Sequence, residues 1–168
     1  MGPMAMTALD YEGIRQLLAR YSVALDLGDV PAFQACFAPD GYFAETGLPL
    51  ETPEGRFEGR KSIGEFAAHF IANAQGHIRH WSSPPLIEGD GHDATGFTFL
   101  MVLRPGSSPG TGVILTGVYR DRYTKIDERW HFAAREFTAD PQPEHRGTSS
   151  RDPLVARFDD FVAGRSRS

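Results

Sequence analysis

Three polar residues that could perform acid–base chemistry lie in otherwise apolar stretches of the sequence. Tyr21 falls on the apolar stripe of a helix predicted from Leu9 to Leu27, and Asp26 lies near the end of that helix. His80 lies in a predicted strand. A buried carboxylate is costly unless it is paired, and histidine is its natural partner. An Asp–His pair can act as a general base, because the carboxylate fixes the imidazole tautomer and stabilises its protonated form.

Ordinary structural interpretations stand beside this chemical one. An Asp at a helix end is commonly a solvated residue or a local cap, and a His on a strand is commonly a hydrogen-bonded structural residue. On an ideal helix Tyr21 and Asp26 point about 140° apart. They converge only if the helix end is distorted or the side chains reach around a cavity.

The elements that must position these residues follow from hydrophobic periodicity and turn signals. Gly28 ends the first helix, and a short second helix after Asp29 ends at the turn Pro39-Asp40-Gly41. Helices first and strands afterwards predict an α+β fold with an antiparallel sheet. The further predicted elements are a short strand over 42–46, a loop over 47–59, a helix over 61–74, and β-rich segments near 77–88, 93–104, 112–125 and 129–138.

The organisation predicted is one domain over residues 8–138, followed by an extension over 139–168. Within the extension, Asp152-Pro153 is a favourable helix start, and an apolar stripe follows it. This short helix is expected to dock on the domain, to form a lid over the pocket, or to pack on a partner subunit.

Composition limits the function classes. The 168 residues are 40% hydrophobic with a net charge of -5, which argues against binding to nucleic acids or anionic membranes. No apolar run is long enough to span a membrane, no signal-peptide pattern begins the chain, and the single cysteine, Cys36, fits a reducing compartment. We therefore expect a cytoplasmic protein. His77 and His80 would point to opposite faces of a strand, so no metal site is predicted.

Several motifs together resemble one known family. The segments Arg20–Asp29, Phe37–Gly41 and Gly55–Arg60, with further matches at 77–81, 117–121 and 129–132, resemble SnoaL-like proteins of the nuclear transport factor 2 superfamily. The resemblance covers roughly residues 8 to 138. It implies a cone-shaped α+β barrel, in which a strongly bent antiparallel sheet wraps around N-terminal helices. The fold alone does not specify an activity.

Three enzymes of this superfamily carry matching catalytic residues. Scytalone dehydratase and hexachlorocyclohexane dehydrochlorinase use an Asp–His pair that matches Asp26 and His80, and bile acid 7α-dehydratase adds a Tyr that matches Tyr21. All three remove a proton from carbon and expel a leaving group. The resemblance therefore implies a cofactor-independent lyase in which His80 is the base, Asp26 orients it, and Tyr21 donates a hydrogen bond to the developing oxyanion or the leaving hydroxyl.

The same resemblance leaves other functions open. Positions catalytic in scytalone dehydratase fall near Glu45 and Arg104, and ketosteroid isomerase matches at Tyr21 and near Glu45 but has an acidic residue where Gly117 stands. An isomerase or polyketide cyclase would use Glu45 or Asp26 as its base. A non-catalytic binding protein, such as a dioxygenase small subunit, is the third alternative.

The expected substrate is a small, mostly apolar cyclic molecule of polyketide or steroid type. Arg104 would face a substrate carboxylate or, as we favour, end a strand in solvent. A homodimer is expected through an outer sheet face that exposes Trp81 and Tyr123. The residues expected to contact substrate, each of which could instead be core, are Glu45, Phe97, Phe99, Met101, Arg104 and Tyr119.

Overall fold

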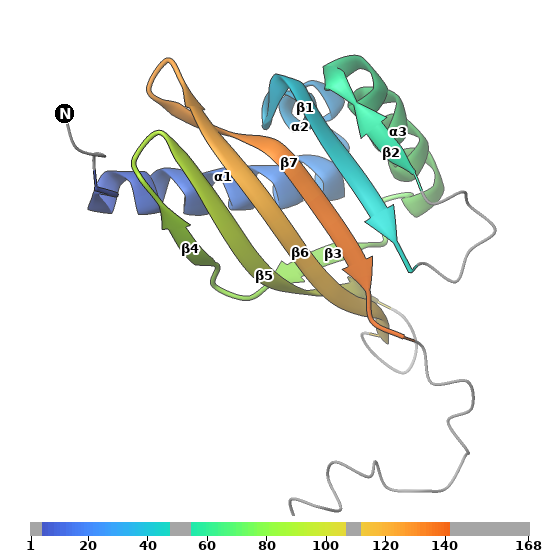
Figure 1. Cartoon of the computed structure of the whole chain (residues 1–168). Helices are drawn as coiled ribbons and strands as arrows, with labels where there is room; N and C mark the ends of the chain where they lie inside the picture. The colour runs from blue at the N-terminus through green and yellow to red at the C-terminus, as the bar shows by residue number, and fades with distance from the viewer. Residues whose placement is uncertain (1–4, 48–54, 107–111, 142–168) are drawn as a thin grey trace, which may run out of the picture.

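In the computed structural model, three helices lie against one strongly curved, open sheet (Figure 1). The structure describes residues 5–47, 55–106 and 112–141, so the helix expected after Asp152 lies outside the described residues. The elements are α1 (Ala8–Leu27), α2 (Val30–Ala35), β1 (Phe37–Thr46), β2 (Arg56–Glu58), α3 (Gly59–Ala74), β3 (Arg79–Ser82), β4 (Leu86–Gly89), β5 (Asp93–Arg104), β6 (Gly112–Ile126) and β7 (Arg129–Ala139).

Local sequence signals fix both ends of α1. Thr7 caps its first turn in a reciprocal hydrogen-bonded box with Asp10, and Gly28 ends it in the left-handed conformation at φ 85°. Asp29 then caps α2 by accepting a hydrogen bond from the Ala32 amide. The short connection turns α2 back against α3, so that the chain enters the sheet beside the helices.

The sheet has the strand order β2-β1-β7-β6-β5-β3, with β4 paired to β5. All neighbouring strands are antiparallel except β1 and β7, which are parallel, so the expected purely antiparallel sheet is corrected at this one pair. The strand predicted at 42–46 begins earlier, at Phe37, and passes through Pro39-Asp40-Gly41 with a register shift. An irregular segment within β1 therefore replaces the expected turn.

The core lies between α1 and the concave face of the sheet. Figure 1 shows α1 crossing this face, with α2 and α3 placed beside β1 and β2. The apolar stripe of α1 is buried there, as predicted from its spacing. None of the described helices combines the length and the apolar character needed to cross a membrane.

Candidate functional site

Asp26 and His80 form a buried pair, although 54 residues separate them in sequence. Asp26 lies in the last turn of α1, and His80 lies in β3. His80 Nδ1 is 2.6 Å from Asp26 Oδ1, while Asp26 Oδ2 accepts a hydrogen bond from the His80 backbone amide at 2.8 Å. The side chain of His80 is only 6% exposed, and that of Asp26 is only 7% exposed. The pair expected from the sequence thus lies within hydrogen-bonding distance.

This geometry determines which ring nitrogen of His80 can act as a base. A carboxylate can only accept hydrogen bonds, so it favours the tautomer with the proton on Nδ1. The neutral ring then carries its lone pair on Nε2, which hydrogen-bonds no described residue. The Phe70 ring packs against the imidazole with centroids 5.7 Å apart and supports its orientation.

His80 lines a cavity of about 460 Å³ between α3 and the concave face of the sheet. That volume is in the range of small-molecule sites. The apolar part of the lining comes from α3, from the residue just before β3, and from β5, β6 and β7: Phe66, Phe70, Ala74, Ile78, Leu100, Val102, Ile114, Leu115 and Phe137. The polar part consists of Glu45, His69, Asn73, His80 and Tyr119.

Glu45 brings a carboxyl group into this apolar cavity from β1. Burial raises its pKa from 4.5 to about 7. No described side chain hydrogen-bonds or ion-pairs with the Glu45 carboxyl. Near neutral pH this group therefore exists in both protonation states, and it can donate or accept a proton.

Tyr119 also lines the cavity, whereas Tyr21 lies behind it in the aromatic core. The Tyr21 and Tyr119 rings are 6.1 Å apart, and Tyr21 also packs against Phe33, Phe37 and Phe132. Burial raises the pKa of Tyr119 to about 12 and that of Tyr21 well above 10. Tyr21 is not among the residues that line the cavity, so Tyr119 is the tyrosine in contact with it.

Sequence reasoning missed Arg135 of β7 and Asp121 of β6, which are 1% and 3% exposed. Arg135 Nε lies 3.3 Å from Asp121 Oδ1. The signal that could have identified them is strand parity, because Asp121 shares its parity with the inward Tyr119 and Tyr123. Arg135 likewise shares its parity with the inward Phe137.

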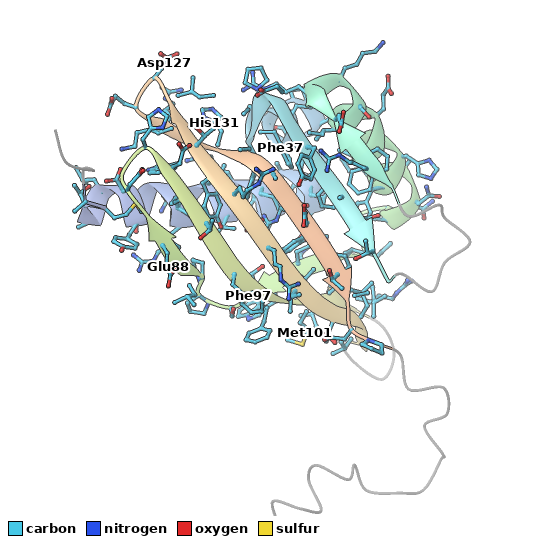
Figure 2. The ribbon with its side chains drawn as sticks, in the orientation of Figure 1. Phe37, Glu88, Phe97, Met101, Asp127 and His131 are labelled. Carbon is cyan, nitrogen blue, oxygen red and sulfur yellow. The ribbon has the colours of Figure 1, made fainter. Side chains whose placement is uncertain are left out.

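Three residues expected to line the pocket do not. Phe97 and Met101 project from β5 on the outer face (Figure 2), and Phe99, which has the same strand parity, is 62% exposed. The inward residues of β5 are Thr98, Leu100 and Val102. Register could have revealed this, because His80 is the cross-strand partner of Val102, and directly paired residues share a face.

Arg104 is exposed and Tyr123 is buried. Arg104 lies exposed at the end of β5 and does not line the cavity, as we favoured. Tyr123, expected on the outer face, is buried with 1% exposure, and its hydroxyl donates to Asp121. Trp81 is exposed as expected.

A larger groove of about 1010 Å³ lies away from the Asp–His pair, near the start of α1 and the β6–β7 turn. It is lined by charged side chains of both signs. Asp10 and Lys125 form an ion pair there, and hydrogen bonds from Lys125 and Thr7 hold the pKa of Asp10 well below its usual range. The smaller cavity is the better candidate, because it collects buried titratable groups in an apolar enclosure.

The described residues contain no group of three or more His, Cys, Asp or Glu side chains placed to hold a metal ion. The polar side chains that line the cavity can supply acid–base chemistry. They provide a hydrogen-bonded imidazole, a carboxyl group of shifted pKa and a phenol.

Comparisons with known proteins agree with this architecture. A family model described as a SnoaL-like domain matches residues 6–136. A solved Nostoc punctiforme protein of unknown function with a cystatin-like fold is 27% identical, with a TM-score of 0.69, and the match covers 84% of this chain and 98% of that chain. No curated protein matches the chain.

Two further structures, both from Novosphingobium aromaticivorans, show the likeness in fold alone. One is an NTF2-like protein with a cystatin-like fold, at 24% identity and a TM-score of 0.70, covering 81% of this chain and 85% of that chain. The other is a candidate scytalone dehydratase, at 18% identity and a TM-score of 0.63, covering 86% and 93%. The chain belongs to the SnoaL-like domain family.

Proposed function

We propose that this protein is a cofactor-independent lyase that eliminates water from a small, mostly apolar, cyclic hydroxy-carbonyl compound. The observation that carries the proposal is the buried Asp26–His80 pair, whose imidazole lines the cavity. A histidine with a purely structural role would not need both a carboxylate that contacts its ring and backbone amide and an apolar cavity beside its imidazole. The neighbouring candidate scytalone dehydratase supports the fold of such an enzyme and not its substrate.

In the proposed reaction, His80 Nε2 removes a proton from the carbon next to the substrate carbonyl. Asp26 holds the Nδ1 proton and balances the charge of the imidazolium that forms. The hydroxyl of Tyr119 donates a hydrogen bond to the carbonyl oxygen, which gains negative charge as the enolate develops. This assignment moves the donor role from Tyr21 to Tyr119, because Tyr119 is the tyrosine in contact with the cavity.

Glu45 supplies the second proton transfer. In its neutral form, favoured by the raised pKa, it protonates the leaving hydroxyl as the carbon–oxygen bond breaks. The products are water and a conjugated carbonyl compound. The proton on His80 returns to Glu45 through solvent before the next turnover, so the protein is regenerated unchanged.

A second candidate function is isomerisation or cyclisation with Glu45 as the base. The observation in its favour is the same buried carboxyl group, whose pKa of about 7 suits a base as well as an acid. This reaction moves a proton or closes a ring without releasing water. A non-catalytic binding protein is the third alternative, and it predicts no proton exchange at all.

Proton abstraction can be tested before the natural substrate is known. Cyclic β-hydroxy ketones are incubated with the protein in D₂O, deuterium uptake at the α-carbon is followed by NMR, and enone formation is followed by absorbance. We expect both signals with the wild type and the loss of both in His80→Gln. His77→Gln, exposed just before β3 and outside the cavity lining, is the matched control and should retain them. Uptake that persists in His80→Gln would contradict the assigned base.

A further inference from the structure

Arg135 is a buried cation directly beneath the cavity tyrosine. Its guanidinium carbon lies 3.6 Å from the centroid of the Tyr119 ring and 4.2 Å from that of Tyr21, with Phe132 at 4.5 Å. The side chain is only 1% exposed. Aromatic faces attract cations, but they do not replace the hydrogen bonds that a guanidinium makes in water. Such burial is costly and calls for a functional explanation.

The positive charge of Arg135 is only partly balanced. Asp121 is its one charged partner among the described residues, and the 3.3 Å contact lacks hydrogen-bond geometry, so Nε and Nη1 of Arg135 have no acceptor. Asp121 Oδ2 accepts a hydrogen bond from the Tyr123 hydroxyl instead. Burial raises the pKa of Asp121 to about 6, although Arg135 and Tyr123 oppose that rise. The counter-ion is therefore a weak one.

The unbalanced charge of Arg135 lies next to Tyr119, which lines the cavity. Arg135 contacts the face of Tyr119, and its effect of lowering the Tyr119 pKa exceeds the opposing effect of Asp121. The other titratable groups near this tyrosine are Tyr21 behind it and Glu45 within the cavity. Glu45 opposes the field of Arg135 only when it is ionised, above a pH of about 7.

We infer that Arg135 and Tyr119 form a receptor for an anionic oxygen, so that the cavity binds phenolates and enolates in preference to their neutral forms. Tyr119 provides the hydrogen bond, and Arg135 acts through it as a positioning residue that supplies a fixed positive field in a water-poor site. This inference rests on the proposed function and deepens it by naming the substrates as ketones that enolise, with phenolates as ligands that mimic the enolate, although the anion binding itself requires no elimination.

Asp121 and Arg135 provide a pair of variants with opposite expected effects. Asp121→Asn removes the counter-ion, can still accept from Tyr123, and leaves more positive charge beneath Tyr119. Arg135→Met removes the positive charge and leaves a side chain of similar length. A purely structural role for the pair predicts that both variants impair the site in the same direction.

The experiment uses a nitrophenol, whose absorbance reports its ionisation, as a probe of the wild-type protein. We expect the bound probe to have a lower pKa than the free probe. Asp121→Asn should lower the pKa of the bound probe further. Arg135→Met should raise that pKa by about one unit, which corresponds to phenolate binding that is about tenfold weaker. Tyr119→Phe should also weaken phenolate binding, and Arg135→Lys should restore part of it.

Arg120→Gln is the matched control, because Arg120 lies beside Tyr119 in sequence but is exposed on the outer face of β6. It should leave the bound probe unchanged. Failure of the wild type to lower the probe's pKa would overturn the inference, and so would equal shifts in Asp121→Asn and Arg135→Met. If Arg135→Met does not fold, Asp121→Asn alone tests the inference: a lower pKa of the bound probe supports it, and a higher pKa overturns it. The elimination proposal fails separately, when His80→Gln retains turnover.

Discussion

Asp26 binds His80 through both of its carboxylate oxygens, one to the ring Nδ1 at 2.6 Å and the other to the backbone amide at 2.8 Å. The same carboxylate thus fixes the end of α1 against β3 and sets the tautomer of the imidazole. Structural and chemical roles are combined in one side chain, and variants can separate them.

Asp26→Asn is expected to reduce turnover by about 10²–10⁴-fold while the fold is retained. The two contacts use different oxygens of Asp26, and asparagine replaces one of them with an NH2 donor, so one contact is lost and the imidazolium charge is not balanced. The measurement is kcat on a β-hydroxy ketone that the wild type converts, with circular dichroism to establish folding. Asp29→Asn, in which the cap of α2 is kept by a residue of equal capping ability, is the control. Equal losses in the two variants would show that the effect is not specific to the pair.

Glu45 is expected to impose an alkaline limit on the elimination near pH 7. As an acid it must be protonated, so the rate should fall as the pH rises through its pKa of about 7, and Glu45→Gln should be slow with no such limb. A pH profile of kcat measures this. A rate that instead increases through pH 7 in the wild type would identify Glu45 as a base and favour isomerisation or cyclisation.

The same carboxyl group should make stability depend on pH. Because the folded-state pKa is raised from 4.5 to about 7, the folded protein binds the proton more tightly than the unfolded chain does. Its contribution is fully present below pH 4.5 and is lost as the pH rises through about 7. In urea unfolding, the free energy of unfolding of Glu45→Gln should therefore rise relative to that of the wild type by up to about 3 kcal/mol between pH 4.5 and pH 8. Glu65→Gln, exposed on α3, should show no such gain.

Sequence periodicity predicted the elements well where one face of an element is uniformly apolar. The helix from 9 to 27 and the strand at 93–104 agree closely with α1 and β5, since caps and turn residues mark their ends. The Asp26–His80 pair was also expected, because a buried carboxylate needs a partner.

Strand faces were harder to predict where both faces carry large side chains. On β5 the aromatic residues Phe97 and Phe99 lie outside, while Thr98 is fully buried, so hydrophobicity alone selected the wrong face. Arg135 was missed for the opposite reason, since a charged residue is not expected in a core unless its neighbours supply a counter-ion and aromatic rings. Those neighbours come from distant strands and become adjacent only in the folded chain.

Thr98→Val is expected to stabilise the protein by about 1 kcal/mol. The Thr98 side chain is fully buried, and its hydroxyl finds no hydrogen-bond partner among the described residues. Valine keeps the shape and removes the unsatisfied polar atom. Urea denaturation measures the difference in the free energy of unfolding between Thr98→Val and the wild type. Thr98→Ala serves as the comparison and should be less stable than Thr98→Val, because it leaves a cavity. A loss of stability in Thr98→Val would show that the hydroxyl is satisfied, for example by a buried water.

The outer face of the sheet is expected to bind a second copy of this chain. Its apolar side chains are continuous across the strands, because Trp81 on β3 pairs with Met101 on β5, and Leu86 on β4 pairs with Phe97. Trp81 and Leu86 are 66% and 67% exposed in the single chain. An apolar patch spread over several strands is typical of an interface.

Sedimentation equilibrium should therefore give a dimer mass for the wild type and a monomer mass for Trp81→Glu, because a charge buried without a partner disfavours association. Val23→Glu, on the exposed side of α1, introduces the same charge at an apolar residue outside the sheet and should remain a dimer. A monomeric wild type would contradict the expectation. So would dissociation by both variants to the same extent, since the effect would then follow from added charge and not from the face that carries it.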